Sequence, residues 1–200
     1  TNIVIPHGFE QLSESFGLKK NKILKVISAG RFVTKKGFND LIKAAEKLQR
    51  DNFPVQIELF GSGPLEAELS KKINDLALKN IRLIGWTEDL HNEFRKADVF
   101  CITSLEEPFG LIIGEAMMSG LPVISTQTDG AIEIFGTEPE KKGAIYVDFS
   151  SPDEIKNAIQ ALINDEKRLL LAQNAHDNIN TNFSLERLSR KLKDLFEYAD

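Results

Sequence analysis

The chain of 200 residues contains little cysteine, no long hydrophobic run and no excess of positive charge. Its single cysteine, Cys101, excludes an internal disulfide and fits a reducing compartment. No apolar run reaches the roughly 20 residues that cross a bilayer, and no signal peptide opens the chain. The formal net charge of −5 disfavours a nucleic-acid-binding protein, which normally has a basic face. These absences favour a cytoplasmic protein with a different class of ligand.

Several functional motifs are also missing. The three histidines, His7, His91 and His176, are scattered, so we expect no metal site and place His91 and His176 at the surface. No G-x-x-x-x-G-K-[S/T] pattern is present, which excludes an ATPase P-loop. Gly61-Ser62-Gly63 starts like a dinucleotide fingerprint, but Glu66 occupies the position of the third glycine, which disfavours NAD binding. Cys101 lies in an apolar run and is expected in the core.

Apolar runs and helical periodicities alternate about six times along the chain. The runs predict strands over residues 25–29, 55–60, 81–84, 99–102, 123–125 and 144–147, with helices between them. Ser151-Pro152-Asp153-Glu154 reads as a capping box that starts one of the later helices. Strands that are continuously apolar are typical of a parallel sheet covered by helices on both faces. The sequence therefore predicts an α/β fold, a three-layer α/β/α sandwich with a parallel sheet of about six strands.

Glycine turns and charged residues follow the predicted strands, at the edge where parallel sheets bind ligands. Arg31 and Lys36 bracket the loop after the first strand, and two cations in an acidic protein suit a phosphate group. An ordinary solvated loop is an equal alternative. Trp86, the only tryptophan, ends the third strand, where packing against a neighbouring helix is slightly favoured over stacking on a base.

Two acids, Glu107 and Glu115, lie eight residues apart, on a turn and on the helix that follows it. Both could face a ligand held over the helix N-terminus, where free N–H groups and the macrodipole favour an anion. The alternative is a pair of exposed acids stabilised by the helix dipole. Gly114 costs about 1 kcal/mol relative to alanine within a helix, so its presence predicts close packing there.

With these residues in place, the chain resembles the carboxyl-terminal, donor-binding domain of the retaining GT-B-fold glycosyltransferases of group 1. The resemblance covers nearly all 200 residues. Its most specific part is the E-x7-E motif from Glu107 to Glu115, E-P-F-G-L-I-I-G-E, followed by A-M-M-S-G-L-P-V-I. V-I-S-A-G-R-F-V-T-K-K-G and F-G-S-G-P also match the family, and V-I-P-H-G-F resembles its interdomain linker. The resemblance implies that the chain is one Rossmann-like half of a GT-B fold.

The resemblance also implies roles for single residues. Glu107 would contact the hydroxyls of the donor sugar and support its developing positive charge, and Glu115 would bind the ribose. Arg31 and Lys36 would neutralise the leaving diphosphate, so that no metal or cofactor is required. The remaining donor contacts would come from the backbone N–H groups of the E-x7-E turn, from the glycine turn and from the turn that meets the base: Phe109, Gly110, Leu111, Gly61, Gly63, Trp86 and Thr87.

The implied domain plan has a linker over 1–22, a nucleotide-sugar-binding domain over 23–183 and a terminal helix over 184–200. That helix would pack toward an amino-terminal Rossmann-like domain, which carries the acceptor contacts. The chain begins without methionine, so we expect that part of the protein precedes it and that this half is inactive alone. Peripheral association with the inner face of the membrane through the other domain stays open.

The expected function is transfer of a hexose-type sugar from a UDP-, GDP- or ADP-sugar, with retention, in polysaccharide or glycolipid biosynthesis. A sugar-nucleotide epimerase and a non-catalytic nucleotide-binding module are the alternatives. Two departures from the family pattern bear on the site, and one further acid in that region matches the pattern. His7 replaces the usual asparagine, Thr128-Asp129-Gly130 stands where a Gly-Gly pair is common, and Glu133 matches an acid to which no role is assigned.

Overall fold

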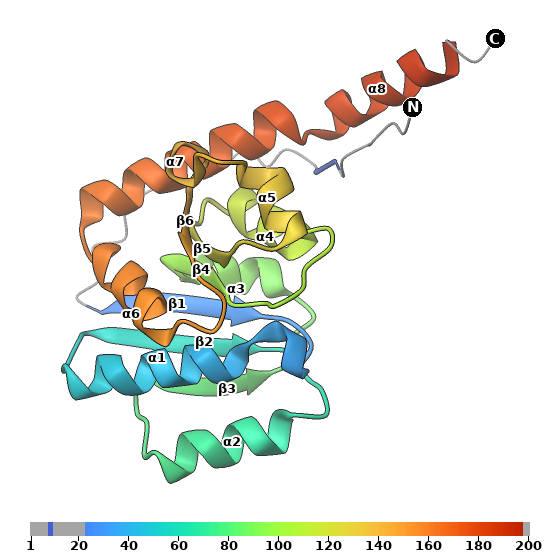
Figure 1. The fold of residues 1–200 in the computed structure, drawn as a ribbon. Coiled ribbons are helices and arrows are strands. Elements are labelled where there is room, and N and C mark those ends of the chain that lie inside the picture. The colour runs from blue at the N-terminus through green and yellow to red at the C-terminus, as the bar shows by residue number, and fades with distance from the viewer. Residues whose placement is uncertain (1–7, 10–22, 198–200) are drawn as a thin grey trace.

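The structure, a computed structural model, describes residues 8–9 and 23–197 and is built on a six-stranded sheet (Figure 1). All the strand pairs are parallel, and the order across the sheet is β3-β2-β1-β4-β5-β6. The predicted parallel sheet is therefore confirmed. The strands are β1 (Leu24–Ala29), β2 (Val55–Phe60), β3 (Ile81–Gly85), β4 (Val99–Ile102), β5 (Val123–Thr126) and β6 (Ala144–Val147).

Helices cover both faces of this sheet, as the continuously apolar strands require. The apolar side chains of one face pack with those of α1 (Phe38–Arg50), α2 (Glu66–Asp75) and α6 (Pro152–Ala161). Those of the other face pack with α3 (Leu90–Lys96), α4 (Leu111–Met118) and α5 (Asp129–Phe135). Helix α7 (Asp165–Asn182) contributes to both clusters, and Cys101 is buried in the core as expected. Burial raises the pKa of the Cys101 thiol to about 12, so it stays protonated at neutral pH.

The order of the strands reverses next to β1. The chain builds β2 and β3 on one side of β1 and then returns to place β4 on the other side, where Val26 pairs with Val99. At such a switch point the loops after the two central strands diverge and leave a crevice at the carboxyl edge. The loops after β1 and β4 are those that carry Arg31, Lys36 and Glu107.

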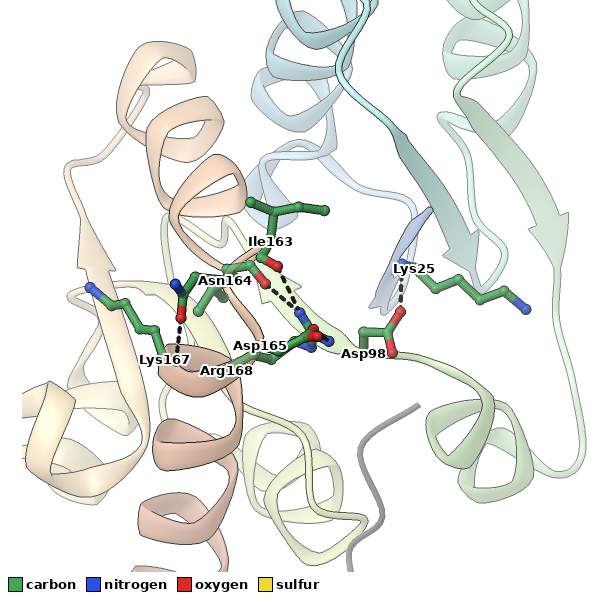
Figure 2. A network of polar contacts seen from close by, with 8 residues as sticks. Lys25, Asp98, Ile163, Asn164, Asp165, Lys167 and Arg168 are labelled. Atoms are coloured by element: carbon green, nitrogen blue, oxygen red, sulfur yellow. Dashed lines mark hydrogen bonds and ion pairs between the residues drawn. The ribbon is translucent and has the colours of Figure 1, made fainter. Parts of the chain in front are cut away.

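A polar corner fixes α7 relative to α6 (Figure 2). The guanidinium of Arg168 is buried, and its Nη1 donates hydrogen bonds to the carbonyl oxygens of Leu162, at 2.8 Å, and Ile163, at 3.4 Å. These carbonyls follow the last residue of α6, where a helix offers carbonyl groups no further intrahelical donor. Asp165 forms an ion pair with Arg168, and the Asn164 side chain caps α7 by accepting from the Lys167 N–H at 2.8 Å. The corner neutralises a buried charge locally and so sets the start of α7.

The predicted capping box at the start of α6 is wrong in its hydrogen bonds. Ser151 is the N-cap residue, but its side chain makes no capping hydrogen bond. The carboxylate of Glu154 accepts instead from the Asp148 N–H at 2.7 Å. The acid therefore ties the loop after β6 to the first turn of α6, a contact that the four-residue pattern could not reveal.

Phe9 joins the beginning of the chain to its last two helices. Its N–H donates to the Phe183 carbonyl at 2.7 Å, and the Leu185 N–H donates to the Phe9 carbonyl at 3.1 Å. Its ring lies against Gly114 of α4, where an added Cβ would stand 2.1 Å from the ring carbon Cζ. The close packing expected at Gly114 is thus confirmed. Apart from Gly8 and Phe9, the predicted linker over 1–22 lies outside the described residues.

The last helix, α8 (Leu185–Glu197), extends beyond the body of the domain in the direction of α7 (Figure 1). Its first residue, Leu185, is 47% exposed. Packing of this helix on another domain stays a prediction. Within the described part of the chain, no helix is both long and apolar enough to cross a membrane.

Candidate functional site

Close contacts between backbones build the carboxyl edge of the sheet. The Gly61 N–H donates to the Gly85 carbonyl at 2.9 Å, and the Phe32 N–H donates to the Ser62 carbonyl at 2.9 Å. A Cβ at Gly61 would stand 1.9 Å from the Gly30 carbonyl oxygen. The loops after β1 and β2 can therefore approach this closely only because glycine occupies position 61.

These three loops enclose a cleft of about 450 Å³, which the first turn of α4 completes. Five residues that the sequence marked as site candidates line this cleft: Arg31, Gly61, Gly63, Trp86 and Thr87. The expected packing of Trp86 against a helix is wrong, because its side chain is 69% exposed at the cleft. Sequence reasoning missed the apolar wall that Leu90 and Ile112 contribute from α3 and α4. Helical periodicity alone could not separate such a wall from the core.

Lys36 and Glu107 form an ion pair beside the cleft. Lys36 ends the short 3-10 helix η1 (Thr34–Lys36) after β1, and Glu107 lies on the loop after β4. Their side chains are only 17% and 13% exposed. The aliphatic part of Lys36 passes Gly30, where an added Cβ would be 3.6 Å from the lysine Cδ. Because Gly30 lines the cleft, the pair lies directly next to it.

Hydrogen bonds hold the two loops of this ion pair together. The Leu105 N–H donates to the Lys35 carbonyl at 2.7 Å, and the Thr103 hydroxyl donates to the Gly37 carbonyl at 3.0 Å. Gly37 adopts a left-handed conformation with φ of 66°, and a Cβ there would stand 1.9 Å from the Thr103 carbonyl oxygen. Gly37 thus allows η1 to approach the end of β4, a role that sequence reasoning missed.

The turn before α4 packs against the first turn of α5. The Gly130 N–H donates to the Glu107 carbonyl at 2.7 Å. A Cβ at Gly130 would stand 2.5 Å from the Gly110 nitrogen and 2.6 Å from the Glu107 carbonyl oxygen. The loop at Thr128-Asp129-Gly130, which departs from the usual Gly-Gly pair, therefore keeps the one glycine that this contact needs.

The first turn of α4 presents the remaining candidates at the carboxyl edge. Phe109 and Leu111 are 62% and 43% exposed, whereas Gly110 is buried at the left-handed start of the helix. Glu115 lies one turn further, on the helix face of Ile112, which lines the cleft. The N-terminal turn of α4 thus borders the cleft through Ile112, and free N–H groups at a helix N-terminus favour an anion.

Glu115 is exposed, yet its desolvation by the surrounding protein raises its pKa above the ordinary glutamate value. A raised pKa in the folded state stabilises the fold below the ordinary pKa of 4.5, and this contribution is lost as the pH rises through the folded-state pKa. We therefore expect Glu115→Gln to raise the melting temperature at pH 7 but hardly at pH 4. Thermal unfolding at the two pH values tests this. An equal effect at both would show that the charge is not responsible.

His91 and His176, expected at the surface, are half-buried. The Nδ1 of His91 lies 2.8 Å from the Ser119 hydroxyl at the end of α4, and the Nε2 of His176 lies 2.8 Å from the Asn180 amide. His7 lies outside the described residues. Among the residues that the structure describes, no group of three or more histidine, cysteine or acidic side chains could hold a metal ion.

Comparisons with known proteins identify the family of the chain. The family model of glycosyl transferases group 1 matches residues 9–180. The chain is 32% identical over 166 residues to LpsE, a lipopolysaccharide core biosynthesis glycosyltransferase of Rhizobium meliloti, covering 82% of the chain and 47% of LpsE. It is 27% identical over 184 residues to the UDP-Gal:α-D-GlcNAc-diphosphoundecaprenol α-1,3-galactosyltransferase of Escherichia coli, covering 90% of the chain and 46% of that protein. The chain thus spans about half the length of these relatives.

Among solved structures, the chain is similar to the C-terminal domain of LpcC, a glycosyl transferase group 1 family protein of Francisella tularensis. The TM-score is 0.71 with 25% sequence identity, and the match covers 82% of this chain and 89% of the LpcC domain. The fold described above therefore corresponds to a carboxyl-terminal domain that others have crystallised by itself.

Proposed function

The chain belongs to the glycosyltransferase group 1 family, and from this premise we propose that it is the donor-binding domain of a retaining hexosyltransferase. Its ligand would be a nucleoside-diphosphate sugar. The observation that carries the proposal is the cleft at the switch point of the sheet, which Arg31, Gly61, Gly63, Trp86 and Thr87 line. The name of the Escherichia coli relative specifies UDP-galactose, which supports this class of donor.

The charges at the cleft suit a diphosphate leaving group. Breaking the anomeric C–O bond leaves negative charge on the diphosphate and positive charge on the sugar. Arg31, Lys36 and the N-terminus of α4 would bind the diphosphate more strongly as its charge grows, which lowers the barrier. Glu107 would accept hydrogen bonds from the sugar hydroxyls and support the positive charge. Glu115 would accept from the ribose hydroxyls.

The acceptor would bind between this domain and an amino-terminal partner domain, so we propose that this half alone does not transfer sugar. The relatives' names point to acceptors in lipopolysaccharide and lipid-linked glycan synthesis. The proposed place of action is therefore the cytoplasm, with the partner domain making any contact with the membrane surface.

Calorimetric titration with UDP-glucose, GDP-mannose and ADP-glucose tests the proposal. We expect one base to be bound preferentially, and we expect that ligand to change the fluorescence of Trp86, the only tryptophan, which is exposed at the cleft. A Trp86→Phe variant contains no tryptophan, so it should still release heat on binding but lose the optical signal, which assigns that signal to the cleft. Absence of heat with all three donors would contradict donor binding. Epimerisation of a nucleotide sugar by the full-length protein without an acceptor would favour an epimerase.

A further inference from the structure

The two cations of the site, Arg31 and Lys36, differ in whether an acid already neutralises them. Arg31 is exposed at the cleft and has no ion-pair partner among residues 8–9 and 23–197. Lys36 is already paired with Glu107, and both side chains are largely withdrawn from solvent. A diphosphate that enters the cleft therefore meets one available positive charge and one neutral pair. To recruit Lys36, it must compete with Glu107.

The backbone cannot relieve this competition, because the two loops are tied to each other and to α5. The hydrogen bond from the Leu105 N–H to the Lys35 carbonyl holds η1 against the loop after β4. The hydrogen bond from the Gly130 N–H fixes the Glu107 carbonyl. With these hydrogen bonds kept, Lys36 and Glu107 separate by rotation of their side chains, and the carboxylate stays beside the cleft when the ammonium leaves it.

We propose that Glu107 makes the site discriminate between the intact nucleotide sugar and the free nucleoside diphosphate; this inference rests on the proposed donor binding. When a nucleoside diphosphate takes Lys36, Glu107 becomes a largely buried carboxylate without a counter-ion, next to negative phosphates, which is costly. The intact donor compensates, because its sugar hydroxyls donate hydrogen bonds to Glu107. The free nucleoside diphosphate has no such group.

The same competition acts after transfer. Once the sugar has left, Glu107 loses its hydroxyl partners and regains Lys36, which weakens the hold on the diphosphate product. Glu107 therefore favours both binding of the donor and release of the product.

Calorimetry with UDP and UDP-glucose, or with the equivalent pair for the base that the donor titration selects, tests the inference. Glu107→Gln keeps the shape of the side chain and releases Lys36. We expect it to tighten UDP binding by about tenfold, which lies within the usual range for the coupling of two binding interactions. The binding of UDP-glucose should weaken or stay unchanged. The matched control is Glu106→Gln, whose carboxylate pairs with Lys35 at 3.8 Å on the same two loops but is 71% exposed. It should leave the ratio of the two affinities unchanged.

The same substitutions in a Lys36→Gln protein distinguish an effect of Glu107 through Lys36 from a general effect of charge on UDP binding. In the Lys36→Gln protein, Glu107→Gln should no longer tighten UDP binding by more than Glu106→Gln does. Circular dichroism and thermal unfolding establish that each variant is folded, and Glu107→Asp serves as a milder change that should shift the ratio in the same direction. If wild-type protein binds both ligands but Glu107→Gln moves the ratio no more than Glu106→Gln, the inference is overturned while donor binding stands. If neither ligand nor any other nucleotide sugar binds, the proposed function itself fails.

Discussion

Replacement of Gly37 by alanine is expected to lower the free energy of unfolding by about 3–5 kcal/mol, among the largest effects of a single methyl group. The added Cβ would stand 1.9 Å from the Thr103 carbonyl oxygen, a backbone atom that is buried at the end of β4. The residue also adopts φ of 66°, which alanine disfavours. Relief of the clash would require η1 to move away from β4. Urea unfolding followed by circular dichroism measures the loss.

Gly136→Ala is the control for the steric part of this effect. Gly136 also has a positive φ, with φ of 61° and ψ of −143°, but an added Cβ there would have nothing within 4 Å of it. We expect this variant to cost about 1–3 kcal/mol, from the strained conformation alone. Equal losses in the two variants would show that the contact between η1 and β4 does not contribute.

Replacement of Arg31 by alanine is expected to weaken binding of the nucleotide sugar by about 100-fold, because charge-assisted hydrogen bonds to a phosphate are worth about 1.5–3 kcal/mol each. Arg31 is the cation of the cleft that no described acid neutralises, so its charge is available to the diphosphate. Stability should hardly change, since the side chain is exposed. Calorimetric titration of the donor selected above measures the loss.

Lys35→Ala removes the same charge four residues away and serves as the control. Lys35 is 54% exposed and pairs with Glu106 at 3.8 Å, so its loss should change the affinity by no more than about twofold. If both variants weaken binding equally, the effect of Arg31 is one of net charge, and the proposed place of the diphosphate is wrong.

Most of the fold could be predicted from the sequence, because its elements are marked by local patterns. The strands predicted over 55–60 and 144–147 are β2 and β6 with the same bounds. Gly30 ends one strand and Pro54 precedes the next, and apolar residues at helical spacing mark the helices. These signals depend only on neighbours along the chain. The local pattern was less informative at Ser151 and Glu154, because the acceptor role of Glu154 depends on the loop after β6 rather than on the four-residue motif.

The candidate site was predictable in its membership but not in its contacts. The strand ends identify Arg31, Gly61 and Trp86 as neighbours at one edge of a sheet. Whether Trp86 packs on a helix or faces the cleft depends on the loops around it, and only the structure shows its exposure. Likewise, His91 is partly buried because its ring lies against the end of α4, where it forms a hydrogen bond with Ser119.

The sequence by itself determined the order of helices and strands and the parallel sheet, because hydrophobic periodicity is a local property of the chain. Only the tertiary structure decided how charge is distributed at the site. Lys36 and Glu107 are 71 residues apart, and each reads as an independent ligand for a different part of the donor. The switch of strand order places β1 beside β4, and Gly37 lets the loops that follow these two strands approach each other. Folding thereby converts two separate charges into one coupled pair.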